Sequence, residues 1–284
     1  MIVSHKHKFI FVHIHKCAGT AIGKALLPHL GDEDIAYGYS PELEIASRES
    51  KEKGGLWKHS PSWEIEEQVS KEVWDNYFKF SFIRSPWDIE VSLYHWWKKT
   101  PARWDKETKE KIIKMDFDEY ILSGYTWEYS LFDFLLKKDQ TVDQSNPKSV
   151  FAEENSASNI DFNVDFIGKY ENLKTDFAYV CGRLNLPNIG LKQTNKSRPL
   201  EKRRTTREEY RSKEAIGKMF HKYYNDIVFF DYDIFNALGR MKGSFAYYCK
   251  EPACVGHAEA HHKCKKWEDN FNDKANKKPY RDTP

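Results

Sequence analysis

The sequence lacks any apolar run long enough to cross a membrane, since a membrane helix needs roughly 18–20 consecutive apolar residues. An apolar signal-peptide core is missing too, because the opening residues, MIVSHKHK, lead straight into a predicted strand. These absences predict a cytoplasmic protein with no membrane span.

A strong charge of one sign is also absent. The chain has 45 Lys and Arg residues against 43 Asp and Glu residues, a formal net charge of +2. This balance excludes a chain-wide basic field, so we expect no nucleic-acid partner. The 284 residues, 40% of them hydrophobic, suffice for one sizeable core.

Cysteine is scarce, with five residues in the chain. Cys17 and Cys181 are isolated, whereas three others lie near a histidine in a polar tail: Cys249, Cys254, His257 and Cys264. Their spacing matches no common zinc pattern, so zinc, a disulfide and free thiols all stay open. We expect a main domain over 1–240 and a Cys/His-rich tail over 241–284.

Apolar runs alternate with helical patterns along the main domain. Strands are predicted over 8–14, 77–83 and 165–169. Helices are predicted over 20–30, 62–74, 86–98, 116–123, 128–137, 173–184, 206–224 and 225–230. Residues 31–60 are expected to be irregular. This alternation predicts a single α/β domain in three layers, with a parallel sheet flanked by helices and an irregular C-terminal tail.

The stretch FVHIHKCAGTAI (11–22) passes from a strand through small residues into a helix. Unpaired amides and the helix dipole make such a helix start a site for an anion. Here the candidate amides belong to Cys17, Ala18, Gly19, Thr20 and Ala21. Gly19 offers backbone freedom, and Thr20 adds a hydroxyl donor.

This loop differs from the nucleotide-triphosphate loop, in which lysine directly precedes Ser or Thr. Lys16 comes before the turn, and Thr20 follows four residues later. Two interpretations stay open. One is a site for an anion that needs no divalent metal, such as a sulfuryl group; the other is a plain strand–turn–helix connection.

The stretch FIRSPWDIEVSLYHW (82–96) repeats the arrangement of a strand, a sharp stop and a helix. Arg84 lies at the end of the strand, where ligands of open α/β sheets bind, and arginine can hold phosphate with two parallel bonds. Ser92 lies two helical turns further on. The alternative is a surface arginine beside the helix-start residue Pro86.

Together, HIHKCAGT (13–20) and FIRSPWDIEVSLY (82–94) resemble the two motifs of the carbohydrate-type (family 2) sulfotransferases. These motifs read H-I-P-K-T-G-G-T and F-V-R-N-P-W-D-R-L-V-S-x-Y. DFIGKYENLKTDF (165–177) and NKSRP (195–199) are also similar, and the resemblance covers roughly 8–235. The departures from the motifs are His15 for Pro, Cys17 for Thr, Ala18 for Gly, Ser85 for Asn, Ile89 for Arg and Glu90 for Leu.

The resemblance implies a P-loop-like fold and transfer of the sulfuryl group of 3′-phosphoadenosine 5′-phosphosulfate (PAPS) to an acceptor hydroxyl, by family default of a saccharide. It implies that the loop amides and Thr20 hold the 5′-phosphosulfate. Lys16 would neutralise the leaving oxygen, and Arg84 with Ser92 would hold the 3′-phosphate. No metal is required by this scheme.

A hydroxyl nucleophile needs a base, and histidine suits neutral pH. His59, in KHSPSWEI, is our candidate, because similar enzymes carry a histidine at this place. His15 ranks second, while His13 is expected to pack at the strand end. Two other functions stay open: a metal-dependent kinase with a degenerate loop, and a nucleotide-binding protein without catalysis.

Overall fold

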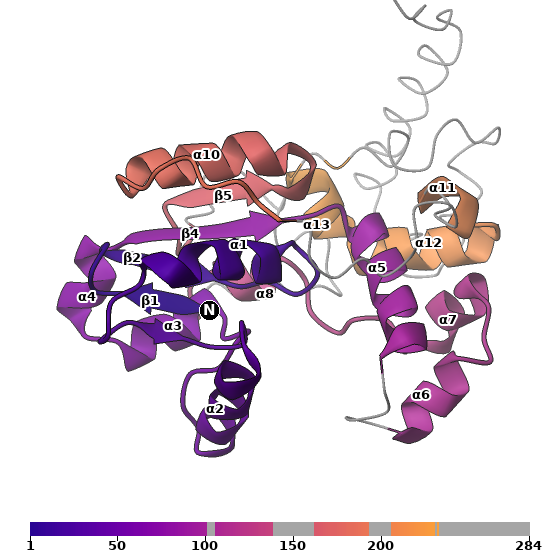
Figure 1. Cartoon of the computed structure of the whole chain (residues 1–284). Coiled ribbons are helices and arrows are strands. Elements are labelled where there is room, and N and C mark those ends of the chain that lie inside the picture. The colour runs from indigo at the N-terminus through magenta and orange to yellow at the C-terminus, as the bar shows by residue number, and fades with distance from the viewer. Residues whose placement is uncertain (101–105, 139–161, 193–205, 231, 233–284) are drawn as a thin grey trace, which may run out of the picture.

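A five-stranded sheet forms the centre of the protein in the computed structural model, which describes residues 1–100, 106–138, 162–192, 206–230 and 232 (Figure 1). Its order is β3-β1-β2-β4-β5. The strands are β1 (Ile2–Ser4), β2 (Phe9–Val12), β3 (Ile35–Ala36), β4 (Phe78–Ile83) and β5 (Phe166–Lys169). The three strands expected from the sequence are confirmed as β2, β4 and β5.

The sheet combines parallel and antiparallel pairs. Strands β2, β4 and β5 run parallel, as predicted, whereas β1 pairs antiparallel with both β2 and β3. The sequence analysis missed β1 and β3, because strands of three and two residues carry too short a pattern. The buried Met1 amino group donates to the Lys58 carbonyl at 2.5 Å, which ties the start of β1 to a distant segment.

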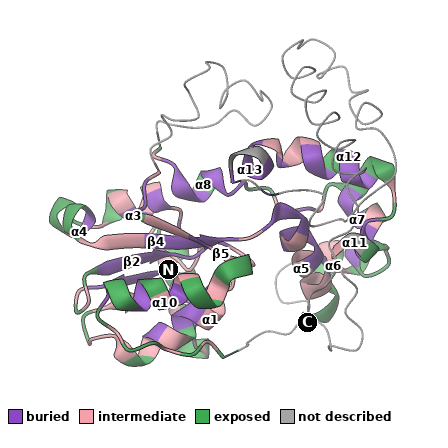
Figure 2. Ribbon diagram, turned by 90° about the horizontal axis from the view of Figure 1, so that it is seen from above, coloured by how far each residue is buried: buried purple, intermediate pink, exposed green. Residues whose placement is uncertain are grey.

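Helices cover both faces of the sheet, which gives the predicted three layers (Figure 2). Phe9 and Phe11 point to one face, where α1 (Gly19–Leu26) and α10 (Leu173–Arg183) pack. Ile10 and Val12 point to the other, because side chains alternate along a strand. That face packs against α3 (Ser62–Gln68), α4 (Lys71–Asn76) and α8 (Phe132–Leu135).

A second group of helices, here called the helical lobe, lies beside the carboxyl ends of the strands (Figure 1). It comprises α5 (Pro86–Lys99), α6 (Lys106–Ile112), α7 (Phe117–Ser123), α11 (Thr206–Glu209), α12 (Lys213–Lys222) and α13 (Tyr224–Phe229). Its core includes the fully buried Trp87, Tyr120 and Met219. The long helix α5 starts directly after β4, so it carries the strand end into this lobe.

Serine caps explain where the sequence predictions were wrong. Residues 31–60 were expected to be irregular, yet Ser40 accepts a bond from the Leu43 amide and starts α2 (Pro41–Glu52). The predicted helix over 62–74 is split, because Ser70 caps α4. Ser212 likewise starts α12 inside the predicted helix over 206–224. A capping serine sets a new helix start wherever its hydroxyl accepts an amide bond.

Several predictions concern residues outside the described ranges. They are the tail over 241–284 with its cysteines and His257, and the NKSRP segment over 195–199. The division into a main domain and a tail therefore stays a prediction. Within the part of the chain that the structure describes, no helix combines the length and apolar character needed to cross a bilayer.

Candidate active site

The loop between β2 and α1 has an unusual backbone. Lys16 and Ala18 both adopt left-handed conformations, with φ of 62° and 64°. Such angles are uncommon outside glycine, and they cluster at functional sites. Turns of this kind aim backbone amides into a concave surface that suits an anion. The Ala18 carbonyl accepts the amides of Ala21 (2.8 Å) and Ile22 (3.2 Å), so α1 starts here.

Gly19 is needed in this loop because of close packing, and not because of the backbone freedom that was expected. The positive φ angles fall on Lys16 and Ala18, not on the glycine. A Cβ atom at residue 19 would instead lie 1.9 Å from Cδ2 of His13. The side chain of His13 is 2% exposed and stacks on Tyr39, so it cannot move aside easily. Glycine is therefore required here by close packing against the strand end, where His13 was predicted to lie.

Arg84 links the two strand ends. It follows β4, the parallel neighbour of β2, and its Nη1 donates to the Lys16 carbonyl at 3.2 Å. Its guanidinium also pairs with Asp88 at 3.2 Å and lies 4.1 Å from the ring centre of Tyr170. The structure thus brings Lys16 and Arg84, which are 68 residues apart, into one site.

Lys16 is a half-buried cation in this site. Burial first, and then the neighbouring Arg84 charge, lowers its pKa to about 8. The ammonium group lies 5.6 Å from the ring centre of Trp96. At neutral pH it is still mostly protonated. Two close cations without a carboxylate for each repel one another, and a bound anion would relieve this repulsion.

Ser92 lies on the face of α5 that borders the loop. Asp88, Ser92 and Trp96 are spaced four residues apart, so they share one face of the helix. Asp88 pairs with Arg84, and Trp96 lies under Lys16. Ser92 therefore sits between the two residues of α5 that contact the candidate cations.

His59 lies beside the loop with a defined ring orientation. Its Nδ1 is 2.8 Å from the carbonyl oxygen of His13, and its ring centre is 3.5 Å from that of His15 in a stacked arrangement. A carbonyl only accepts, so Nδ1 carries the proton and Nε2 keeps its lone pair. Burial, followed by the charges of His15, His13 and Lys58, holds the pKa of His59 well below its usual range. The ring is therefore neutral at pH 7.

The sequence analysis missed the contribution of β5. Tyr170, directly after this strand, supplies the ring beneath Arg84. Glu171 accepts a bond from the Ser85 amide at 3.0 Å, which fixes the start of α5. The residues YEN do follow a predicted strand, and parallel strands end at the same edge of a sheet. That signal could have placed both residues at the site.

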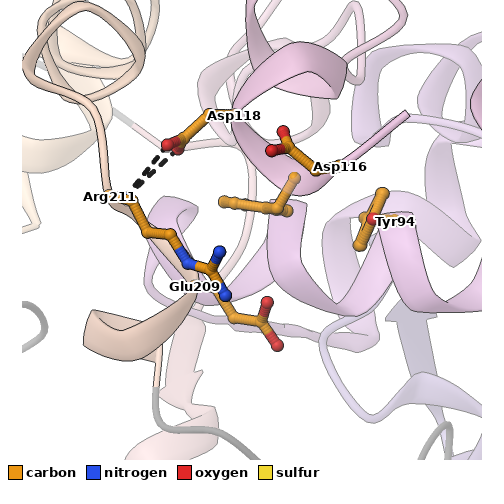
Figure 3. A pocket seen from close by; sticks show the side chains of 6 residues that line it. Tyr94, Asp116, Asp118, Glu209 and Arg211 are labelled. Atoms are coloured by element: carbon orange, nitrogen blue, oxygen red, sulfur yellow. Dashed lines mark hydrogen bonds between the residues drawn. The ribbon is translucent and has the colours of Figure 1, made fainter.

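A separate pocket in the helical lobe is rich in carboxylates (Figure 3). It is lined by Tyr94, Asp116, Phe117, Asp118, Glu209 and Arg211. Its acidic groups already have structural roles. Asp118 accepts the amides of Arg211 and Ser212, and Asp116 forms a capping box with Glu119. Glu209 lies 2.9 Å from His95. This pocket is part of the scaffold and not of the candidate active site.

Among the residues that the structure describes, no group of three or more His, Cys, Asp or Glu side chains could hold a metal ion. This includes His13, His15 and His59: the rings of His15 and His59 stack, and the ring of His13 is tilted by 58° to that of His59. The expected independence of metal stays a prediction.

Three comparisons with known proteins gave matches to this chain. Residues 1–233 match the sulfotransferase family. An uncharacterized protein of Archaeoglobus fulgidus is 33% identical over 127 residues, which are 45% of this chain and 83% of that protein. A crystal structure of mouse sulfotransferase SULT7A1 complexed with PAP is similar at 17% identity and a TM-score of 0.33, over 95% of this chain and 88% of that one. On the strength of the match over residues 1–233, the chain belongs to the sulfotransferase family and is a sulfotransferase.

Proposed function

We propose that this sulfotransferase moves the sulfuryl group of PAPS to the hydroxyl of an acceptor. The observation that carries the proposal is the bond from Arg84 to the Lys16 carbonyl, which joins two basic residues at adjacent strand ends. An adenosine with phosphate groups on both its 5′ and 3′ sides needs two anion sites close together. Family membership favours sulfuryl transfer over the kinase alternative.

In this proposal the β2–α1 loop holds the 5′-phosphosulfate. The donors are the amides of Cys17, Ala18, Gly19, Thr20 and Ala21, together with the Thr20 hydroxyl. Support comes from the left-handed Lys16 and Ala18, because this backbone form gathers amides around an anion. The Ala21 amide is already bonded to Ala18, so it would be shared between the two acceptors.

The 3′-phosphate is assigned to Arg84 and Ser92. Arg84 already pairs with Asp88, and its guanidinium has five N–H donors, so it can hold a phosphate while keeping one of its present contacts. Ser92 is on the same face of α5 as Asp88 and can add a hydroxyl donor. A nucleotide without the 3′-phosphate would leave this second site empty.

The transfer step needs one base and one cation. The acceptor oxygen forms a bond to sulfur while its proton passes to Nε2 of His59. The bond between sulfur and the 5′-phosphate oxygen breaks, leaving 3′-phosphoadenosine 5′-phosphate (PAP). Lys16 neutralises the charge that grows on this leaving oxygen. The low pKa of His59 then favours return of the proton to water.

The acceptor is proposed to be a saccharide, following the resemblance to carbohydrate-type enzymes. Aromatic rings near His59 support a ring-shaped acceptor: Trp57 lies 5.6 Å from the His59 ring and Trp127 lies 5.3 Å from the His15 ring, centre to centre. Sugar rings present an apolar face to such side chains. The cytoplasmic location and the absence of a metal requirement stay predictions from the sequence.

Calorimetry tests the choice of nucleotide. PAP, ADP and ATP are titrated into the full-length protein with and without Mg²⁺. We expect PAP to bind at least about tenfold more tightly than ADP, because a charge-assisted bond contributes about 1.5–3 kcal/mol. Added Mg²⁺ should leave PAP binding unchanged. Tighter binding of ATP with Mg²⁺ than of PAP would refute the proposal and support the kinase alternative.

A further inference from the structure

A chain of contacts runs from the interior of α5 to the candidate base. It begins at Glu90, whose side chain is fully buried. Its carboxylate accepts bonds from the hydroxyls of Tyr120 (2.9 Å) and Tyr223 (2.5 Å) and from the amide of Trp127 (3.0 Å). A buried carboxylate is costly unless it is bonded in this way, so these partners are held firmly.

Trp127 is the next member of the chain. Besides its amide bond to Glu90, its carbonyl accepts a bond from the Lys222 ammonium group and lies 3.0 Å from the oxygen of the Tyr223 hydroxyl, which donates its proton to Glu90. Its indole stacks on Phe134, with 5.6 Å between ring centres, and meets His15 edge-on at 5.3 Å. The backbone and the ring of Trp127 are therefore both fixed, and this ring confines one edge of His15.

His15 connects Trp127 to the proposed base, His59. Its ring stacks on His59 with 3.5 Å between centres and 19° between planes. His59 is held on its other side by the bond from Nδ1 to the His13 carbonyl. One contact fixes the tautomer of His59, and the stack fixes the plane of its ring. Together they fix the direction in which Nε2 points.

Two departures from the family motifs meet in this chain of contacts. His15 stands where proline is usual, and Glu90 stands where leucine is usual. A proline could not offer an aromatic ring to His59, and a leucine could not bond the Trp127 amide. The two positions are 75 residues apart, and Trp127 contacts both of them. The two departures therefore belong to one connected set of contacts.

We propose that His15 and Trp127 are positioning residues for His59, with Glu90 anchoring Trp127, so that Nε2 of His59 is held toward the acceptor. This inference rests on the proposed role of His59 as the base. The charged and titratable neighbours are His13, His15 and Lys58 for His59, and Lys16, Lys51, Lys58 and the N-terminal amine for His15. Protonating either ring beside these cations is unfavourable, which keeps the stacked pair neutral.

The test reads His59 directly and needs no acceptor. Full-length protein labelled with ¹⁵N-histidine is studied by long-range ¹H–¹⁵N correlation, with His59 assigned through His59→Gln. In the wild type we expect one tautomer, protonated at Nδ1. In His15→Leu and Trp127→Ala the ring of His59 should turn away from the His13 carbonyl, which mixes the tautomers, and water reaching the ring should raise the His59 midpoint by about one pH unit. His15→Phe and Trp127→Phe should restore the single tautomer.

Trp97→Ala is the matched control, since Trp97 is also half-buried but packs against the core of the helical lobe. It should leave the His59 signals unchanged. Unchanged His59 signals in His15→Leu and in Trp127→Ala would overturn the proposal. If Trp127→Ala does not fold, His15→Leu and His15→Phe decide. PAP calorimetry on the same samples tests the proposed function separately from the positioning of His59. Failure to bind PAP would refute the proposed function, whereas the His59 spectra test the positioning whether or not PAP binds.

Discussion

The β2–α1 loop and the helical lobe differ in backbone strain and in how their charged groups are paired. The loop holds two left-handed non-glycine residues, and its cation Lys16 lies beside Arg84 at the end of β4. The lobe holds a buried carboxylate, Glu90, with three bonds, and an acidic pocket in which Asp116 and Asp118 accept bonds from backbone amides. Strain and like charge gather where a ligand is proposed to bind, whereas the carboxylates named in the lobe have hydrogen-bond partners. The comparison predicts that changes in the loop affect binding and transfer, and that changes in the acidic pocket of the lobe affect stability.

The largest effect is expected for His59→Ala. Removing a general base slows proton transfer by about 10²–10⁴-fold. We therefore expect transfer from PAPS to fall by that factor in a product assay, while calorimetry finds unchanged affinity for PAP. Full transfer by this variant would show that another group is the base and would weaken the contrast between the two regions.

Arg84→Gln should have the next largest effect. It removes a charged donor from the proposed 3′-phosphate site, which costs about 1.5–3 kcal/mol, or about 10–100-fold in PAP affinity. Affinity for ADP, which lacks the 3′-phosphate, should change much less. Equal losses for both nucleotides would mean that Arg84 acts through the loop and does not read the 3′-phosphate.

Asp118→Ala tests the other side of the comparison. Asp118 accepts the amides of Arg211 and Ser212 ahead of α12. Loss of hydrogen bonds to such a charged acceptor costs about 1.5–3 kcal/mol. Urea unfolding should show this decrease, and PAP affinity should stay at the wild-type value. A large loss of PAP affinity would show that the lobe and the loop are coupled.

Acid should destabilise the protein through its histidines. Burial and neighbouring cations lower the pKa of His13, His15 and His59 from 6.5, in the case of His15 to about 3. Below pH 6.5 the unfolded chain binds protons that the folded chain does not, so the free energy of unfolding falls as the pH drops toward 3.

Each such histidine contributes a slope of at most about 1.4 kcal/mol per pH unit. His15→Phe removes one of them while keeping an aromatic ring. Urea unfolding at pH 7 and pH 5 should therefore show a smaller loss in His15→Phe, by about 2 kcal/mol. An identical pH dependence in the variant and the wild type would mean that His15 is charged in the folded protein.

The smallest effect is expected for Ala18→Gly. A left-handed alanine costs about 1–2 kcal/mol, and the added freedom of glycine in the unfolded chain offsets part of that gain. We expect the free energy of unfolding to rise by about 0.5–1 kcal/mol, measured by urea unfolding. A loss of stability would show that the loop conformation is not strained at this residue.

Much of the site could be predicted from the sequence because it lies at strand ends. The apolar runs ending at Ile14 and Ile83 locate two strands, and parallel pairing brings the residues that follow them to one edge of the sheet. Lys16 and Arg84 meet there as expected. The roles of Thr20, Ser92 and the loop amides stay predictions.

Other features could not be predicted, because they depend on contacts between distant segments. Tyr170 lies beneath Arg84 only because β5 pairs with β4. The need for glycine at residue 19 comes from the ring of His13 and not from a backbone angle. Ser40, Ser70 and Ser212 each start a helix. Serine is common, however, and the sequence does not show which serines are helix caps.

By itself the sequence determined the layered α/β architecture and the basic residues at two strand ends, since hydrophobic periodicity and local turn residues act over short distances. Tertiary structure alone decided which histidine ring stacks on which, and that Glu90 is tied to Trp127. The physical reason is that a buried charge and a stacked ring depend on partners far away in the chain. Such partners can be identified only from the folded structure, in which the core is complete.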